Sequence, residues 1–267
     1  MAHGINRAFI QVVVSHALLA IAAWLMVIQT KMLSTASETS TLFEPAIMVA
    51  VFCIYRLAYY GISWPLEKFN WSAYKELPWF LSLLLMLFFF LEPFEMAGLM
   101  VASIMAIAYM LEVGKWKGMR SLPIIKSIWV ALVWTITTVV IPVFHHFSLD
   151  AVMLILERFL FLLSICIIYN LRDTKSDFLQ GISTITHKIG TLRTKQLTIL
   201  LLAIDSLVVY VHHYSLPVYS AINCSLFITA IIILMAEEDG HRLYYSLTVD
   251  ATMIIQSLLV IFAATFW

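Results

Sequence analysis

The sequence predicts an all-helical integral membrane protein with nine transmembrane helices and a cytoplasmic N-terminus. The first observation is composition: 62% of the 267 residues are hydrophobic, 12% are charged, and the mean hydropathy is +0.94. Soluble domains are roughly 45–50% apolar and about 25% charged. The second observation is a recurrence of hydrophobic runs long enough to span a membrane. The third is a gathering of basic residues in alternate connections.

Composition also excludes whole classes of protein. So apolar a chain is not expected to be a small soluble enzyme, a disordered regulator or a secreted disulfide scaffold. The formal net charge is zero, so the overall charge indicates no nucleic-acid partner. The expected surroundings are membrane lipids.

The helices follow from the length of the apolar runs, because a helix needs about 20 mostly apolar residues to cross about 30 Å of hydrocarbon. Nine segments qualify when tilt and short spans are allowed for. They are residues 9–29, 45–62, 78–92, 95–113, 125–145, 151–170, 196–214, 217–236 and 246–267. None of the seven prolines lies in the middle of a span. No linker or soluble segment interrupts the series, which predicts one polytopic domain over residues 1–267.

The orientation follows from the basic residues. The N-terminus and every second connection lie on one side of the predicted bundle. The basic residues of that side are Arg7, Lys68, Lys75, Lys115, Lys117, Arg120, Lys126, Arg172, Lys175, Lys188, Arg193, Lys195 and Arg242. The opposite side holds Lys31 alone. The positive-inside rule places the basic loops in the cytoplasm and the C-terminus outside a cell membrane.

Polar residues gather where the span 151–170 ends. Asn170, Asp173 and Asp177 are spaced three and four apart, so a continuing helix would place them on one face. Such an oxygen-rich edge suits Mg²⁺, which prefers one or two carboxylates, retained waters and phosphate oxygens. Arg172 and other nearby cations could take further phosphate charge. The alternative is a solvated, salt-bridged loop that carries only an orientation signal.

The order of these residues resembles the second aspartate motif of the UbiA superfamily of intramembrane prenyltransferases. That motif reads roughly D-x-R-D-x-x-x-D-x-x-x-G-x-x-T-(x)₅-G. The matching residues are Arg172, Asp173, Asp177, Gly181, Thr184 and Gly190. Family members have nine transmembrane helices and a cytoplasmic N-terminus, with this motif between helices six and seven. Hydropathy and charge place it between the same two helices here.

The resemblance implies Mg²⁺-dependent transfer of a prenyl group from a prenyl diphosphate to a lipophilic acceptor, in this family commonly an aromatic one. It makes Asp173 and Asp177 the catalytic carboxylates and the metal ligands, with Asn170 as a third ligand. A second and looser resemblance lies in the connection before residue 125. There the family carries a tyrosine followed by basic residues that meet the diphosphate. The corresponding residues are Tyr109, Lys117, Arg120 and Lys126. Of these, Tyr109, Lys117 and Arg120 join Arg172 as expected diphosphate partners.

The sequence departs from the family pattern at the first aspartate motif, N-D-x-x-D-x-x-x-D, which the family places at the end of helix two. Residues 51–64 contain no carboxylate here, and Asn170 replaces the first aspartate of the second motif. Arg56 could supply a guanidinium in place of a second metal ion, because Arg binds phosphate bidentately. The alternative is that Arg56 extends to the lipid headgroups.

Two other functions stay open. A catalytically silent relative would serve as a lipid-binding or scaffold protein. A small transporter is the third possibility, although no span is interrupted by a central Gly or Pro of the kind that marks a transporter's substrate site.

Several ionisable residues lie inside predicted spans, where burial is expensive. They are His16, Glu157, Arg158, Asp205 and Asp250. Glu157 and Arg158 are adjacent, so on a helix they point about 100° apart and are not expected to pair with each other. Two histidine pairs, His145–His146 and His212–His213, fall on the outer face. They could bind zinc or copper if their connections meet, or they could simply lie at the interface.

Overall fold

The computed structural model describes residues 2–34, 39–60, 62–64, 77–113, 119–122, 124–179, 184–241 and 244–266. The long helices are α1 (Ala2–Leu33), α2 (Phe43–Tyr60), α3 (Leu77–Phe88), α4 (Pro93–Met110), α5 (Ile125–Thr135), α6 (Leu149–Arg172), α9 (Thr191–Val211), α10 (Leu216–Met235) and α11 (Asp250–Phe266). A π-helical turn η4 (Ile136–Val140) extends α5, and a second, η6 (Tyr244–Val249), precedes α11.

Short elements join the long helices. They are the helices α7 (Thr174–Leu179) and α8 (Ile185–Ile189), the 3₁₀ turns η3 (Met119–Ser121) and η5 (Phe144–His146), and the strands β1 (Ile62–Trp64) and β2 (Leu111–Val113). The two strands pair in parallel with Ile62 opposite Leu111. This pairing ties the chain after α2 to the chain after α4.

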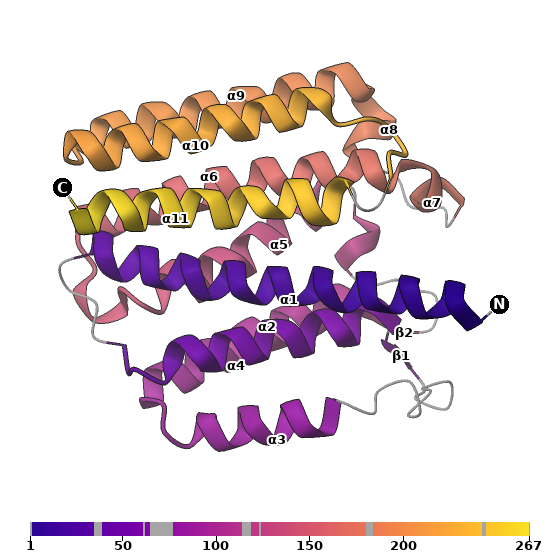
Figure 1. Ribbon diagram of the computed structural model, residues 1–267, viewed down its shortest axis with the longest axis horizontal. Coiled ribbons are helices and arrows are strands. Elements are labelled where there is room, and N and C mark those ends of the chain that lie inside the picture. The colour runs from indigo at the N-terminus through magenta and orange to yellow at the C-terminus, as the bar shows by residue number, and fades with distance from the viewer. Residues whose placement is uncertain are drawn as a thin grey trace.

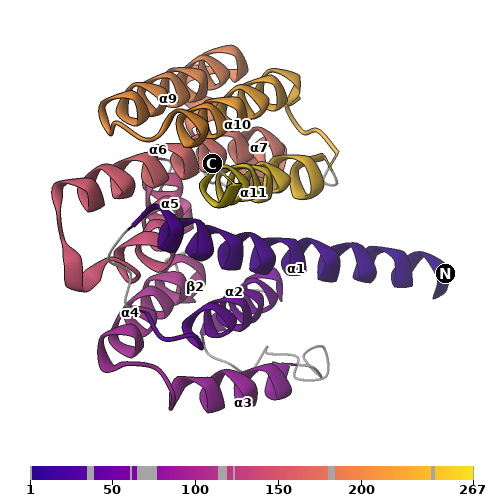
Figure 2. The same cartoon turned by 60° about the vertical axis from the view of Figure 1, so that its left-hand side comes forward.

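The long helices form a bundle in which α6 packs against α5 and α9, while α1 packs against α2 and α11. Figure 1 places the N-terminus, both strands, α7 and α8 at one end of the bundle and the C-terminus at the other. Figure 2 shows α9, α10 and α11 stacked on one side of α1 and the helices α2, α3 and α4 on the other. We call the end that carries α7 and α8 the aspartate end, because Asp173 and Asp177 lie there.

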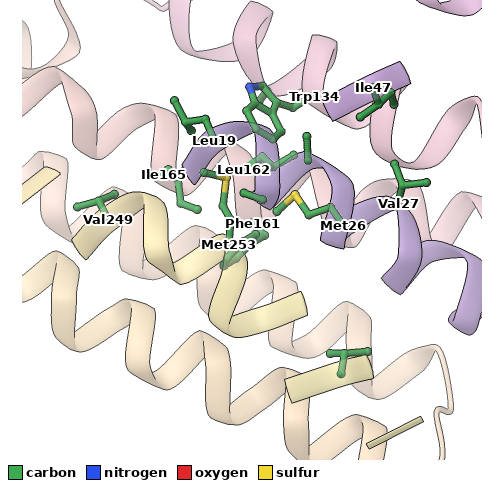
Figure 3. Packing of buried hydrophobic residues seen from close by; sticks show 14 of the residues in the cluster. Leu19, Met26, Val27, Ile47, Trp134, Phe161, Leu162, Ile165, Val249 and Met253 are labelled. Atoms are coloured by element: carbon green, nitrogen blue, oxygen red, sulfur yellow. The ribbon is translucent and has the colours of Figure 1, made fainter. Parts of the chain in front are cut away.

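The core lies where α1, α6 and α11 meet. Met26 of α1, Phe161 and Leu162 of α6, and Met253 of α11 converge there, beside Trp134 of α5 (Figure 3). The fully buried Ala22 and Ala23 have no side chain beyond Cβ, so the neighbouring helices approach α1 closely. The outer surface is apolar as well, with Trp79 80% and Phe89 77% exposed. An apolar exterior around a packed interior fits a bundle that lies in lipid.

Every predicted span contains a helix. Six helices are long and apolar enough to cross a membrane, and two shorter apolar helices cover Pro78–Phe88 and Ile125–Val140. The membrane location is therefore supported, while nine crossings and the cytoplasmic N-terminus stay predictions. Two of the boundaries that differ from expectation have a clear local cause. The span 95–113 ends as a helix at Met110 because the next three residues form β2, and the span 125–145 loses its helix after Val140, where Pro142 cannot donate a backbone hydrogen bond.

Candidate functional site

The junction between α6 and α7 carries the two aspartates. Helix α6 ends at Arg172, and its C-cap Asp173 has φ −98° and ψ 5°. The Asp177 N–H donates to the Asp173 carbonyl at 2.8 Å, so the two aspartates stay one turn apart. The Thr174 hydroxyl lies 2.8 Å from the Asn170 carbonyl and 3.1 Å from the Leu171 carbonyl. The predicted continuous helix through Asp177 is therefore wrong at one residue, Asp173.

Asp239 causes this interruption. In a continuous helix the Lys175 N–H would donate to the Leu171 carbonyl. Instead, the Leu171 carbonyl accepts from the Asp239 N–H at 2.9 Å, and the Lys175 N–H donates to Asp239 Oδ1 at 2.8 Å. Asp239 lies in the connection between α10 and η6 and has a left-handed φ of 52°, which Asp tolerates better than most residues. We call this pair of hydrogen bonds the Asp239 clamp.

Asp173 forms a two-bond ion pair with its neighbour Arg172. The distances are 2.7 Å from Nε to Oδ1 and 2.8 Å from Nη2 to Oδ2. The guanidinium carbon lies 4.6 Å from the centre of the Tyr169 ring, within the range of a cation–π contact. Arg172 is therefore held on one side by a carboxylate and on the other by an aromatic face.

Asp177 pairs with Lys126, at 2.7 Å between Oδ2 and Nζ. Lys126 lies in the first turn of α5, so this contact joins two helices across the aspartate end. Both side chains are largely buried, at 12% and 13% exposed. In the sequence Lys126 is one of the basic residues that follow Tyr109 in the looser family resemblance, but nothing in its spacing indicated Asp177 as its partner.

Asn170 turns inward rather than toward the aspartates' solvent-facing side. It is fully buried, and its Nδ2 donates to Ser127 Oγ at 3.1 Å and to the Ile167 carbonyl at 3.0 Å. Its Oδ1 is buried without a hydrogen-bond partner. A neutral amide can occupy this helix interface at lower cost than the aspartate of the family motif, because no charge is desolvated.

The buried Asp250 accepts a hydrogen bond from Tyr169, the residue whose ring lies against Arg172. The Tyr169 hydroxyl donates to Asp250 Oδ1 and also lies 2.9 Å from the Tyr245 carbonyl. Asp250 is 3% exposed and begins α11. The sequence marked Asp250 as an ionisable residue inside a span but did not place it near the aspartates.

An apolar cavity of about 120 Å³ lies between α2, α4 and α5. Small residues form much of its wall, namely Ala50, Ala58, Ala102, Ser103 and Ala106. Tyr55, Trp134 and Tyr109 also line it, and Trp134 Nε1 donates to the Tyr55 hydroxyl at 3.2 Å. We call this space the apolar cavity.

Comparisons with known proteins identify the fold. No family model matches this sequence, and no curated protein matches it. A structure of a UbiA homolog from Archaeoglobus fulgidus bound to Cd²⁺ is similar, with a TM-score of 0.63 and 14% identity over 94% of this chain and 97% of that chain. A structure of a UbiA homolog from the same organism bound to GPP and Mg²⁺ gives a TM-score of 0.63 and 13% identity, covering 93% of this chain and 97% of that one. The chain has the UbiA fold. The resemblance predicted from the aspartate motif is confirmed at this level.

Thr184 and Gly190, two further residues of the aspartate motif, stabilise the backbone conformation at the two ends of α8. Thr184 caps α8 by accepting the His187 N–H at 3.3 Å, and the His187 side chain accepts the Thr184 N–H at 3.1 Å. Gly190 has a φ of 82°, a left-handed conformation that favours glycine, and it separates α8 from α9. Gly181 lies outside the described residues.

Of the other predicted diphosphate partners, the structure describes the side chains of Arg56 and Tyr109. Arg56 of α2 is 3% exposed, so it is buried in the bundle instead of extending to the headgroups. Tyr109 lines the apolar cavity near the end of α4. Lys117 lies outside the described residues, and of Arg120 only the backbone is described, in η3.

The carboxylate oxygens at the aspartate end are of the type that Mg²⁺ prefers. Asp173 and Asp177 supply such oxygens, whereas the unpartnered Asn170 Oδ1 belongs to a side chain that turns inward to Ser127. Asp177 uses one oxygen on Lys126, whereas Asp173 uses both on Arg172. The only acidic residue in α2 is Glu44, in its first turn and far along the helix from Arg56. The described residues therefore supply carboxylates at Asp173 and Asp177 but none beside Arg56.

A second charged cluster lies toward the other end of α6, and we call it the glutamate cluster. Glu157 Oε1 lies 2.6 Å from His212 Nδ1, and Glu157 Oε2 accepts from the Tyr214 hydroxyl at 3.0 Å. Burial and the Glu157 charge raise the pKa of the Tyr214 phenol. The sequence predicts that Arg158 does not pair with its neighbour Glu157. In the structure Arg158 Nη2 lies 3.4 Å from Thr30 Oγ1. The members are Glu157, Arg158, Asp205, His212 and Tyr214.

The glutamate cluster contains polar atoms without partners. Arg158 Nη1 and Asp205 Oδ1 are buried and unpaired, and both residues line a cavity of about 10 Å³ with Gln29 and Gln256. A space of this size and polarity suits a single water molecule. Within the described residues no group of three or more His, Cys, Asp or Glu could hold a metal ion. His145 instead packs against Phe94, with ring centres 4.2 Å apart.

Proposed function

We propose that this chain is a UbiA-like membrane prenyltransferase, which transfers a prenyl group from a prenyl diphosphate to a lipophilic acceptor of aromatic type with the help of Mg²⁺. The observation that carries the proposal is a juxtaposition. Two carboxylates and two cations lie at the aspartate end, and the apolar cavity lined by Tyr109 reaches toward that end along α4. A prenyl diphosphate has the same division into a charged head and an apolar chain.

The apolar cavity would hold the first part of the prenyl chain. Burial of each CH₂ contributes about 0.8 kcal/mol, so an apolar wall favours an isoprenoid over a polar ligand. The alanines of α2 and α4 leave room that larger side chains would fill. Tyr55 and Trp134 present aromatic faces, which stabilise positive charge developing on the prenyl carbon.

Charged residues at the aspartate end would hold the diphosphate. Arg172 and Lys126 donate to its oxygens and stabilise the negative charge that grows as the carbon–oxygen bond breaks. Asp173, Asp177 and Asn170 are the proposed ligands of a Mg²⁺, which when bound neutralises the leaving diphosphate. Lys117, Arg120, Tyr109 and Arg56 are proposed as further diphosphate contacts.

Ligand-dependent thermal stability of the detergent-purified protein tests this function. Geranyl diphosphate with Mg²⁺ at about 100 times its Kd should stabilise the protein by roughly 2.7 kcal/mol. The matched variant is the double substitution Asp173→Asn and Asp177→Asn, in which the shift should disappear. Transfer of a labelled prenyl group to a panel of aromatic acceptors then tests turnover. Absence of any shift with several prenyl chain lengths would contradict the proposal.

A second candidate is a catalytically silent relative that binds a lipid diphosphate or acts as a scaffold. The observation in its favour is that internal cations already occupy both aspartates, while α2 offers no carboxylate near Arg56. This candidate predicts a thermal shift with geranyl diphosphate but no release of diphosphate with any acceptor. Release of diphosphate in step with prenyl transfer would exclude it.

A further inference from the structure

The glutamate cluster places two oppositely charged residues inside the bundle, away from the aspartate end. A helical rise of about 1.5 Å per residue puts Arg158 about 21 Å from Arg172 along α6. Arg158 is 3% exposed, and Asp205 of α9 is 1% exposed. Neither residue takes part in the proposed prenyl transfer. Because charge is expensive inside a membrane bundle, the presence of both residues there needs a physical reason.

The charged groups of these two residues are only partly paired. Arg158 Nη2 lies 3.4 Å from Thr30 Oγ1, but Arg158 Nη1 and Asp205 Oδ1 are buried and have no hydrogen-bond partner among the described residues. Buried donors and acceptors are nearly always hydrogen-bonded, to protein or to an ordered small molecule. A donor and an acceptor that both lack a protein partner therefore indicate a ligand that satisfies the two together.

One cavity lies beside both residues. Its volume is about 10 Å³, and its wall also includes Glu157 of α6, Gln29 of α1 and Gln256 of α11. A volume of this size is the lower limit for one water molecule, so any larger ligand is excluded. Side-chain amides can donate as well as accept, so the two glutamines can complete the three or four hydrogen bonds that a buried water makes.

The chemistry of the wall decides which ligand of this size fits. A guanidinium N–H can only donate and a carboxylate oxygen can only accept, so the ligand must accept from Arg158 and donate to Asp205. A monovalent cation cannot accept, and Arg158 repels it. A halide cannot donate, and the two carboxylates repel it. We propose that the cavity binds one water molecule, which bridges the Arg158 guanidinium to the Asp205 carboxylate.

The bridging water has two consequences for the molecule. It joins α6 to α9 through hydrogen bonds of a neutral ligand instead of a direct ion pair, and the glutamines bring α1 and α11 to the same point. It also puts a neutral molecule among the intramembrane charges where an ion-coupled transporter would hold its ion, so the transporter alternative loses its best site. This inference is independent of the proposed prenyl transfer.

X-ray radiolytic footprinting of the full-length, detergent-purified protein tests the site directly. Radiolysis of a bound water produces hydroxyl radicals, which oxidise the nearest side chains even where bulk solvent does not reach. Leu154 and Ile222 line the cavity and are 4% and 3% exposed. Leu162 and Ile168 are controls of the same residue types, buried in the apolar core. Mass spectrometry should detect oxidation at the two cavity residues and only background at the controls. Background at all of these positions would overturn the proposal.

Substitutions of the two charged residues test the bridge itself. Asp205→Asn keeps an oxygen acceptor and should retain oxidation at the cavity residues. Arg158→Met/Asp205→Leu replaces both polar partners with apolar side chains, so this oxidation should fall to the level of the controls. Its persistence in a double variant whose melting curve shows a folded protein would contradict the bridge. If the double variant does not fold, the comparison within the wild-type protein is decisive.

Ion replacement distinguishes a water from a bound ion. The melting temperature of the wild-type protein is measured in equimolar sodium chloride, potassium chloride, choline chloride and sodium gluconate. A bound water predicts the same melting temperature in all of these salts, whereas a bound ion would stabilise the folded protein according to its occupancy. A rise that is specific to one ion and absent from Arg158→Met/Asp205→Leu would overturn the proposal and make the glutamate cluster an ion site.

Discussion

Helix α6 carries a charged cluster toward each end, and the two clusters differ in exposure and in the origin of their partners. At the aspartate end, Arg172 and Asp173 are each 30% exposed and are neighbours in sequence. In the glutamate cluster, Arg158 is 3% and Asp205 1% exposed, and the contacts come from α1, from α9 and from the turn after α9. The Arg172–Asp173 pair is partly exposed and local, whereas the glutamate cluster is buried and assembled from distant segments.

This difference indicates two uses of the same residue types. An ion pair near solvent is worth about 0–1 kcal/mol, so its members can change partners at little cost. A buried pair is expensive to break, because the remaining charge has no compensation. The Arg172–Asp173 pair is therefore able to change partners, and the glutamate cluster is suited to holding helices together.

The largest predicted effect tests the structural side of this comparison. Arg158→Met should destabilise the protein by about 3–5 kcal/mol, because Arg158 is a buried cation that lines a small cavity with Glu157 and Asp205, and its loss removes positive charge from beside these two acidic residues. Denaturant unfolding in detergent measures the loss. Arg158→Met/Asp205→Leu should be less damaging than Arg158→Met alone. If the single variant unfolds like wild type, the glutamate cluster is not what holds these helices.

The next effect tests the functional side. Asp173→Asn/Asp177→Asn should lower the free energy of unfolding of the unliganded protein by about 1–2 kcal/mol, less than Arg158→Met, because the Arg172–Asp173 pair is partly exposed and only the Asp177–Lys126 pair is largely buried. The same variant should lose the whole ligand-dependent gain of roughly 2.7 kcal/mol. Melting curves with and without geranyl diphosphate and Mg²⁺ give both quantities. A large loss of stability without ligand would mean that the aspartates are structural, like the glutamate cluster.

Tyr169→Phe tests whether Tyr169, which lies beside Arg172, contributes to stability or to ligand binding. The change keeps the aromatic face under Arg172 but removes the hydroxyl that donates to Asp250, and a buried acceptor left without its donor costs about 1–3 kcal/mol. Unfolding should show this loss. Tyr169→Phe/Asp250→Leu should recover part of it, and a loss confined to ligand affinity would place Tyr169 in the binding site instead.

The smallest predicted effect concerns the Asp239 clamp. Asp239→Ala removes the acceptor for the Lys175 N–H and puts alanine at a left-handed φ, so about 1 kcal/mol should be lost. Asp239→Asn keeps an acceptor oxygen and tolerates that φ, and it should stay near wild type. Equal behaviour of the two variants in melting experiments would show that the side-chain oxygen does not matter.

The sequence predicted the parts of this molecule that depend on local pattern. Hydropathy predicted a helix in every span, and the order of Arg172, Asp173 and Asp177 predicted a fold that the structural neighbours confirm. Contacts between distant segments could not be predicted. The partner of Asp177 is in the first turn of α5, and the break at Asp173 depends on Asp239. Periodicity along one helix contains no information about either contact.

The Asp239 clamp makes the backbone at Asp173 depend on a segment far along the chain. The backbone at Asp173 is set by a residue in the connection between α10 and η6, so the angle at which α6 passes into α7 depends on the C-terminal helix pair. A lipid, a neighbouring protein or a substitution that displaced α10 or α11 would tilt the two carboxylates relative to each other without touching them. The C-terminal third of the chain therefore influences the backbone geometry at Asp173, although neither motif aspartate belongs to it.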